Sequence, residues 1–363
     1  MARKCNPPGR VLPLAVLLCG VTALAACSGV SVLSQPPHPT AATASAAVTV
    51  SGRPVSGGGA TVVRVVTPGT APLPTPAALL PFPGTTAFPD LGIWQPSGRL
   101  VGGQAAIYET LLVPPGDTKR AGIAWMDTSL LSARLYSGSL SPGGGPFKYT
   151  APVATAEAAS LVAAFNGGFQ MKDAHGGYYT EGRLVKPLVQ GAASLVIYAD
   201  GAVTVGAWGT DVTMTPTVVA VRQNLYPLVV NGEPAARANT RTWRVWGSTC
   251  PCGPGLHGLE HQWRSGLGVT AEGALVYVVG PGLTPPEVAD LLVRAGTVRG
   301  MELDINPSWP VFASFKPATA DGLAAPSNGV QLTNTSRGPK TFFDPRYNRD
   351  FITMSARPAS GSR

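Results

Sequence analysis

The residue whose type and position best suit chemistry is Asp304, a carboxylate at the end of a predicted strand. The strand covers 298–303, and Ile305-Asn306-Pro307 follows it, where proline cannot donate the hydrogen bond that a continuing strand needs. A carboxylate at a strand-to-loop junction is firmly held and can face a cleft, where it could act as a base for water or as a nucleophile. The alternative is an aspartate that only caps its own turn, and this stretch alone favours that alternative.

Other polar residues also lie at strand ends. Asn166-Gly167-Gly168 follows an apolar strand over 161–165; asparagine suits sugar hydroxyls because it donates and accepts, and glycines let a backbone approach a ligand closely. Arg222 follows a valine-rich strand and Arg264 begins another, and the planar guanidinium group can bind phosphate through two oxygens. In isolation, the asparagine is more typical of a tight turn and each arginine of a protein surface.

A cysteine and histidine cluster offers a metal-binding alternative. His257-Gly258-Leu259-Glu260-His261 matches the H-x-x-E-H signature of some zinc peptidases, and Cys250 and Cys252 lie just upstream. The peptidase site needs a helix that places both histidines on one face, but proline and glycine occupy four positions of 251–255 and Gly258 interrupts the motif. A zinc hydrolase that uses His257 and His261 therefore stays the minor alternative. We predict neither a metal nor a cofactor, because P-loop and dinucleotide fingerprints are missing as well.

The elements that must position these residues are mostly short strands joined by tight turns. A helix is predicted over 285–295, because apolar residues recur on one face, Thr284 and Glu287 can form a capping box, and Gly296 ends it. Two hairpins are predicted, with turns at Asp200-Gly201 and Glu272-Gly273. The pattern favours a single α+β domain with a mixed, largely antiparallel β-sheet and two or three helices.

Composition and charge narrow the functional class. Charged residues make up 13% of the 363 residues, while Gly (44) and Pro (36) are abundant, which is typical of a turn-rich β protein. The formal charge is +8, but the basic residues are scattered without runs or interleaved aromatics, so nucleic acid is not an expected partner. The charge supports a modest attraction for anionic ligands or surfaces. Nothing in the sequence indicates an oligomeric state.

The N-terminal segment predicts export. Basic residues precede an apolar run over 11–23 that is too short for a good membrane span, and Leu24-Ala25-Ala26-Cys27 resembles a bacterial lipoprotein signal. We expect a signal peptide over 1–26, lipid on Cys27 and anchoring to the outer face of the bacterial cell membrane. The alternative is an ordinary secretory signal with an incidental cysteine. The signal carries three of the 27 basic residues and none of the 19 acidic ones, so its removal leaves a charge of +5.

Composition also divides the exported chain into two parts. Residues 27–88 are dominated by Pro, Ala, Ser, Thr and Gly, which cannot bury enough apolar area to offset chain entropy, and they predict a disordered tether. Aromatic residues and alternating strands begin after that, so the folded domain is predicted over 89–358. Only Cys250 and Cys252 remain in it, so the core must be hydrophobic rather than held by a disulfide framework.

Five motifs, taken in order, resemble the phosphodiester glycosidase family, and the chain is most similar to a bacterial exported branch of it. The motifs are Ala163-Ala164-Phe165-Asn166-Gly167-Gly168-Phe169, Asp200-Gly201 with Val205-Gly206, Leu228-Val229-Val230-Asn231-Gly232, Arg264-Ser265-Gly266-Leu267-Gly268-Val269, and Leu303-Asp304. Each motif alone is weak, whereas their shared order is moderately specific.

The resemblance implies an exported hydrolase that cleaves the glycosyl–phosphate bond of a sugar-1-phosphodiester in cell-envelope glycans. It implies three catalytic residues, with Asp304 as the carboxylate, Arg264 as the cation that holds phosphate, and Asn166. The substrate-binding residues expected beside them are Gly167, Gly168, Arg222, Asn231, Gly232 and Asn306.

The chain departs from the family pattern directly after Asp304. Many members place several glycines and a serine there, whereas this chain has Ile305-Asn306-Pro307 before Ser308. The loss of glycine narrows the approach of the backbone to a ligand. The alternative from another functional class is therefore a non-catalytic envelope protein that binds glycans at the same cleft.

Overall fold

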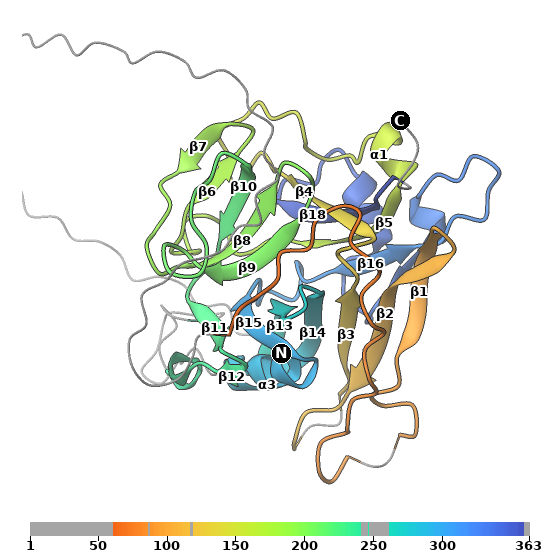
Figure 1. Cartoon of the computed structure of the whole chain (residues 1–363), viewed down its shortest axis with the longest axis vertical. Helices are drawn as coiled ribbons and strands as arrows, with labels where there is room; N and C mark the ends of the chain where they lie inside the picture. Colours follow the sequence, from red (N-terminus) through yellow and green to blue (C-terminus); the bar gives the residue numbers. More distant parts are fainter. Residues whose placement is uncertain (1–60, 86–87, 117–118, 241–245, 247–260, 359–363) are drawn as a thin grey trace, which may run out of the picture. The chain divides into compact units, whose positions relative to one another are not determined.

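The computed structural model describes residues 61–85, 88–116, 119–240, 246 and 261–358, all within the compact unit Gly57–Arg363. Strands make up most of its regular structure (Figure 1). Every ladder between the described strands is antiparallel, and parallel pairing occurs there only as isolated bridges. The predicted α+β class with few helices is confirmed.

The largest sheet has eight strands and carries the strand that precedes Asp304. Its order is β1 (Gln95–Val101), β2 (Gln104–Leu112), β3 (Ala121–Met126), β14 (Leu275–Leu283), β13 (Gln262–Thr270), β15 (Thr297–Glu302), β11 (Pro227–Val230) and β12 (Glu233–Pro234). The predicted hairpin at Glu272-Gly273 is present as β13 and β14, and the predicted strand 298–303 is β15.

Two five-stranded sheets complete the β structure. One has the order β7 (Arg183–Lys186), β6 (Tyr178–Thr180), β10 (Val218–Gln223), β8 (Ala193–Tyr198) and β9 (Val203–Ala207). The other has the order β17 (Gly329–Gln331), β16 (Phe312–Phe315), β5 (Leu161–Asn166), β18 (Phe351–Ala356) and β4 (Leu131–Tyr136). The predicted hairpin at Asp200-Gly201 is present as β8 and β9.

The central strands of the large sheet are buried on both faces, because alternate side chains enter two different cores. On β14, Leu275, Tyr277 and Val279 enter a core that also contains residues of both five-stranded sheets. Val276 and Val278 enter a second core with the apolar face of helix α3. The large sheet therefore forms a rigid middle layer on which polar residues at strand ends can be held in place.

Helix α3 (Pro285–Arg294) packs against β13, β14 and β15 of the large sheet (Figure 1). The backbone N of Glu287 donates to Thr284 Oγ1 at 3.4 Å, and the backbone N of Thr284 donates to Glu287 Oε2 at 2.7 Å, which confirms the predicted capping box. Gly296 follows at a φ of +85°, as a helix C-terminus favours. The other helices whose bounds the described residues give are short: α1 (Thr155–Ala158) and the 3-10 turns η1 (Ala236–Asn239), η2 (Pro326–Asn328) and η3 (Pro339–Phe343).

A segment of the predicted tether packs against the sheets. In this strap, residues 61–85, Val66 and Phe82 are only 1% and 4% exposed. The backbone N of Leu73 donates to Asp127 Oδ2 at 2.9 Å. Composition missed this contact because a few apolar side chains among many prolines suffice when a large sheet already provides their partners.

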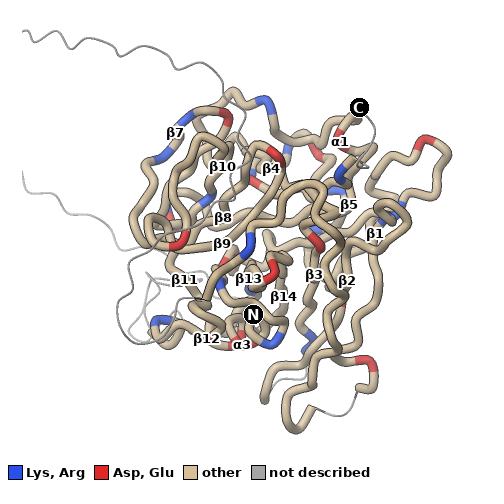
Figure 2. The backbone as a smooth tube through the Cα atoms, viewed as in Figure 1, with Lys and Arg blue, Asp and Glu red and all other residues tan. Residues whose placement is uncertain are grey.

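The rest of the N-terminal predictions lies outside the described residues. These are the signal peptide over 1–26, the lipid on Cys27 and the part of the tether that covers 27–60. Among the described helices, none combines the length and apolar character that crossing a membrane requires. Lys and Arg positions are separated along the described chain in Figure 2 rather than gathered in one stripe.

Candidate active site

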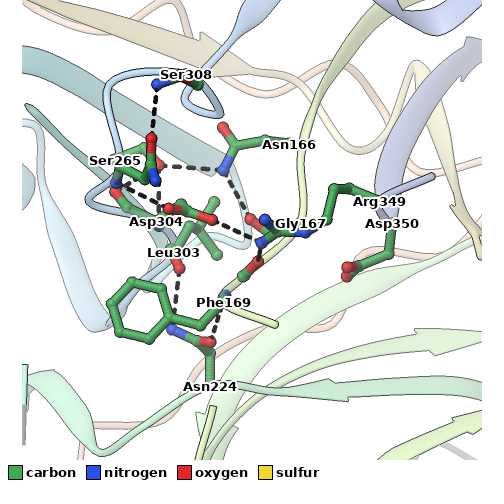
Figure 3. Close-up of polar contacts among 12 residues, drawn as sticks. Asn166, Gly167, Phe169, Asn224, Ser265, Leu303, Asp304, Ser308, Arg349 and Asp350 are labelled. Atoms are coloured by element: carbon green, nitrogen blue, oxygen red, sulfur yellow. Dashed lines mark hydrogen bonds and ion pairs between the residues drawn. The ribbon is translucent and has the colours of Figure 1, made fainter. Parts of the chain in front are cut away.

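Asp304 lies two residues after the end of β15 and is 3% exposed, whereas residues 306–308, which follow it, are exposed. Its backbone exchanges hydrogen bonds with Ser265, whose N donates to Asp304 O at 2.9 Å. Its Oδ1 accepts from the backbone N of Asn306 at 2.9 Å, and its Oδ2 accepts from Arg349 Nη2 at 2.8 Å (Figure 3). The carboxylate is therefore fixed by both its turn and a buried cation, so turn capping is only part of its role.

Burial and charge act on Asp304 in opposite directions. Burial raises the pKa of its carboxyl group, while the Arg349 guanidinium and the backbone N–H of Asn306 oppose the rise. The net direction is upward. A carboxylate whose proton affinity is raised is a better base and nucleophile than a solvated one.

Arg349 is a site residue that sequence reasoning missed. Strand β18 pairs antiparallel with β5, with Phe351 opposite Asn166, so the residues before Phe351 lie beside those after Asn166. Arg349 Nη2 accordingly donates to the Gly168 carbonyl at 2.8 Å as well as to Asp304. The available signal was an Arg-Asp pair just ahead of a predicted strand, but the pairing of that strand cannot be derived from its own residues.

Asn166 ends β5 and connects neighbouring segments through its side-chain amide. Its Oδ1 accepts from Tyr277 Oη at 2.6 Å and from the Val311 N at 3.1 Å. Its Nδ2 donates to the Gly167 carbonyl at 2.6 Å and to Ser265 Oγ at 3.2 Å (Figure 3). An amide has two donor hydrogens and two acceptor lone pairs, so its capacity is used inside the protein. Asn166 is thus a positioning residue here, and the expected bond to a sugar hydroxyl would have to replace one of these.

Gly167 and Gly168 allow close approach, but to protein side chains. A Cβ at Gly167 would lie 2.1 Å from Asp350 Oδ2, and one at Gly168 would lie 2.4 Å from Asn224 Oδ1. Asn224 in turn accepts from the Phe169 N at 2.9 Å and donates to the carbonyls of residues 302 and 303. The two glycines therefore let β5 dock on the strands that carry Asp304.

Arg222 lies in the same cluster and is buried. Its Nε is 2.7 Å from Asp350 Oδ2, and its Nη1 donates to the Gln223 carbonyl at 2.5 Å. Its Nη2 also donates to the Phe169 carbonyl. Asp350 balances the charge of Arg222, and backbone carbonyls accept from both its Nη1 and its Nη2. Arg222 therefore holds the loop after β5 in place and does not offer its charge to a substrate.

Arg264 is fully buried and its charge is directed at Glu302. Its Nη1 pairs with Glu302 Oε1, and its Nε donates to the Leu283 carbonyl at 2.8 Å. Burial raises the pKa of Glu302 to about 7, with Arg264 acting against the rise and Asp304 adding to it. Arg264 therefore lies beside the site, one residue from Ser265, but its described contacts do not place it as the phosphate-holding cation expected from the sequence.

Asn231 and Gly232 are not brought to Asp304. Strand β11 runs antiparallel to β15, with Val230 opposite Arg299, so the end of β11 lies at the start of β15. Asp304 follows the other end of β15. The expectation that Asn231 and Gly232 line the same cleft does not fit this pairing, because antiparallel neighbours bring opposite ends together. Asn306, by contrast, is adjacent to Asp304, and its exposed side chain accepts from the Ser308 N at 3.0 Å.

The metal-binding alternative rests on Cys250, Cys252, His257 and His261. Of these four, only His261 lies within the described residues. His261 Nδ1 lies 2.7 Å from the Gly282 carbonyl and 3.9 Å from Glu287 Oε2. Among the described residues, no group of three or more His, Cys, Asp and Glu side chains could hold a metal ion. The absence of a metal in the site stays a prediction.

Residues 159–304 match the model of the phosphodiester glycosidase family. The resemblance predicted from the five motifs is confirmed. The matched range contains Asn166, Arg222, Arg264 and Asp304, and it ends at the carboxylate itself. The phosphodiester glycosidase match does not reach Arg349 and Asp350, which the residues just before the last strand, β18, add to the cluster.

Solved structures of low sequence identity are similar to this chain. One is the zebrafish N-acetylglucosamine-1-phosphodiester alpha-N-acetylglucosaminidase catalytic domain auto-inhibited by pro-peptide, at 15% identity and a TM-score of 0.44, covering 73% of this chain and 88% of that one. Another is a hypothetical protein from Synechocystis, at 10% identity and a TM-score of 0.39, covering 72% of this chain and 64% of that one. No curated protein matches the chain.

Proposed function

We propose that this protein is an exported hydrolase that cleaves the glycosyl–phosphate bond of a sugar-1-phosphodiester. One observation carries the proposal: Asp304, at the end of a phosphodiester glycosidase match, is a buried carboxylate held 2.8 Å from Arg349 and followed by an exposed loop. A carboxylate and a guanidinium group therefore lie together just after β15, next to the glycine-rich residues after β5 and to the residues before β18.

The reaction needs a carboxylate close to the anomeric carbon. The bond between that carbon and the phosphate oxygen breaks through an oxocarbenium-like state, and the phosphate leaves with the electron pair. If Asp304 acts as base, it takes a proton from the water that attacks the carbon; if it acts as nucleophile, water later releases the sugar. A phosphate group is a good leaving group, so strong help from a general acid matters less than charge stabilisation.

The proposal assigns the cation beside the reacting centre to Arg349 rather than Arg264. Arg349 contacts the carboxylate directly, whereas the Arg264 guanidinium pairs with Glu302. Arg349 favours the ionised form of Asp304 and so opposes the rise in its pKa that burial causes. Since Asp304 is only 3% exposed, binding of substrate in this scheme includes a shift of the loop 306–308.

Export and anchoring belong to the same proposal. The sequence before Cys27 supports lipidation, which would hold the enzyme at the outer face of the cell membrane, where cell-envelope glycans are the available substrates. In cells, a Cys27→Ser variant should leave the membrane fraction; a variant that stays there would contradict the anchor.

The test is hydrolysis by wild type and Asp304→Asn. A panel of methyl phosphodiesters of common sugar 1-phosphates is incubated with each protein, and released free sugar is measured. The variant keeps the shape of the side chain but removes its charge, so the rate should fall by roughly a thousandfold or more. Asp90→Asn is the matched control, because Asp90 is exposed and pairs with Arg120 away from the cluster.

Two results would contradict the proposal. Undiminished cleavage by Asp304→Asn would remove Asp304 from the mechanism. Binding of glycans by the wild type with no release of sugar from any member of the panel would favour the non-catalytic envelope protein. Thermal unfolding of each variant shows whether a lost rate reflects lost folding.

A further inference from the structure

A second arginine, Arg337, comes from the segment after β17 and packs against the loop that follows Asp304. The Trp309 ring has the Arg349 guanidinium carbon 4.6 Å from its centroid and the Arg337 guanidinium carbon 4.3 Å from it. Arg349 also reaches Asp304, so the three side chains form a continuous row from the carboxylate outward. The loop that bears Trp309 is the one in which this chain departs from the family pattern.

Arg337 is held by a backbone carbonyl and by aromatic rings, while Asp344, the carboxylate that acts on it without an ion pair, is itself paired with Arg346. Its Nε donates to the Ser308 carbonyl at 2.5 Å, and its guanidinium also lies 5.5 Å from the Tyr347 ring centroid. The neighbouring Ser336 Oγ donates to the Pro307 carbonyl at 2.7 Å, which fixes the two segments together. Within the described part of the chain, Arg337 forms no ion pair, whereas the charge of Arg349 is balanced by Asp304.

Two buried polar groups of the same cluster lack a partner. Arg349 Nε and Tyr347 Oη have no hydrogen-bond partner among the described residues, although Arg349 is 4% and Tyr347 6% exposed. A buried polar group without a partner costs free energy, so such groups in a native structure mark strain or an absent ligand. A third orphaned atom among these residues, the acceptor Asp350 Oδ1, belongs to a carboxylate whose charge Arg222 balances. Arg349 Nε and Tyr347 Oη can both donate, and Arg337 beside them forms no ion pair with the described residues, so an acceptor-rich anion suits these donors.

We propose that Arg337, Trp309 and Arg349 form the subsite that binds the phosphoryl group of the substrate, with Arg337 as its main cation. This inference rests on the proposed function, because it identifies the anion as the phosphate of the glycosyl phosphodiester. Arg349 bridges the carboxylate and the subsite, so a phosphate bound there lies next to the anomeric carbon that Asp304 attacks or activates water for. Trp309 packs against both guanidinium groups and holds them in place, which lowers the entropy lost on binding.

The direct test is binding of inorganic phosphate and dimethyl phosphate, measured by isothermal titration calorimetry on the full exported chain. Wild type should bind both, and Arg337→Gln should weaken binding by about tenfold or more, because a charge-assisted hydrogen bond is lost. Arg337→Lys should fall between them, since lysine keeps the charge but not the fork. Arg120→Gln is the control, because Arg120 is paired with the exposed Asp90 away from the cluster. Phosphate binding unaffected by Arg337→Gln, or absent in wild type, would overturn the subsite.

A second readout separates the subsite from the catalytic proposal. On a cleavable sugar-1-phosphodiester, Arg337→Gln should raise KM with a smaller change in kcat, while cleavage of an uncharged aryl glycoside of the same sugar should change little. Equal losses on both substrates would contradict a phosphate-binding role. If phosphate binding depends on Arg337 but no phosphodiester is cleaved, the subsite stands and the hydrolase proposal falls.

Discussion

At the scale of single residues, the site is defined by which charges are paired and with what. Glu302 and Asp304 are two residues apart, yet Glu302 pairs with Arg264 and Asp304 with Arg349. Both carboxyl groups are buried, so each pair is shielded from water, and the charge of Asp304 still adds to the raised pKa of Glu302. Glu302 also has an Oε2 without a hydrogen-bond partner among the described residues, which makes its charged form costly.

A pH prediction follows for Glu302. Its pKa rises from 4.5 to about 7 on folding, so the folded protein keeps a proton that the unfolded chain has lost. This contribution to stability is fully present below pH 4.5 and is lost as the pH rises through about 7. Relative to Glu302→Gln, the unfolding free energy of wild type should therefore fall by on the order of 3 kcal/mol between pH 4.5 and 8. Urea denaturation at several pH values measures it, and parallel curves for the two proteins would contradict it.

At the scale of elements, the site depends on how closely β5 docks on the strands around it. The residues after β5 contain no side chain at the two positions where Asp350 and Asn224 approach. The pairing of β18 with β5 brings Arg349 to Gly168, and the pairing of β13 with β15 brings Ser265 to Asp304. Each functional side chain thus comes from a different strand, and each is placed by a neighbour that is distant in the sequence.

Alanine at Gly168 tests this docking. Its added Cβ would meet Asn224 Oδ1 at 2.4 Å, and Gly168 has a φ outside the left-handed region, so the variant probes space alone. We expect a loss of about 1–3 kcal/mol in unfolding free energy, as overpacking of a buried contact costs. Gly338→Ala is the control, because the atom nearest its Cβ would lie 3.5 Å away. Equal stability of the two variants in urea would show that the contact can relax.

At the scale of the whole chain, the strap and the last strand extend the folded unit beyond the phosphodiester glycosidase match. Residues 61–85 contribute Phe82 to the core that also contains the apolar face of α3, and the residues just before β18 contribute Arg349 to the site. The matched residues 159–304 therefore carry the catalytic carboxylate of the proposal but not all of its supports.

Phe82 tests whether the strap stabilises the unit. It is 4% exposed and lies under the guanidinium of Arg294 at 3.8 Å, whereas Phe88 is 38% exposed and lies under that of Arg120 at 4.4 Å. Phe82→Ala should cost about 3 kcal/mol or more of unfolding free energy through the cavity it leaves, and Phe88→Ala less than about 1 kcal/mol. Denaturant unfolding compares them, and a loss below about 1 kcal/mol for Phe82→Ala would mean that the strap adds little to the core.

The sequence alone determined the local structure of this protein. Short-range rules of hydrogen bonding and backbone conformation predict its turns and element ends. Examples are the capping box of α3, the turns at Asp200-Gly201 and Glu272-Gly273, and the end of β15 just before Asp304. The ordered motifs also indicated the phosphodiester glycosidase family, because they sample residues that the fold requires at fixed places along the chain.

Only the tertiary structure decided which polar residues meet. Arg264 and Arg349 are both arginines near the start of a strand. Yet Arg264 is buried with Glu302, whereas Arg349 pairs with Asp304. Asn231, like Asn166, is an asparagine at the end of a strand, but it lies near the start of β15, away from Asp304. The physical reason is that strand pairing joins segments far apart in the sequence, and its direction and register set which side chains are neighbours.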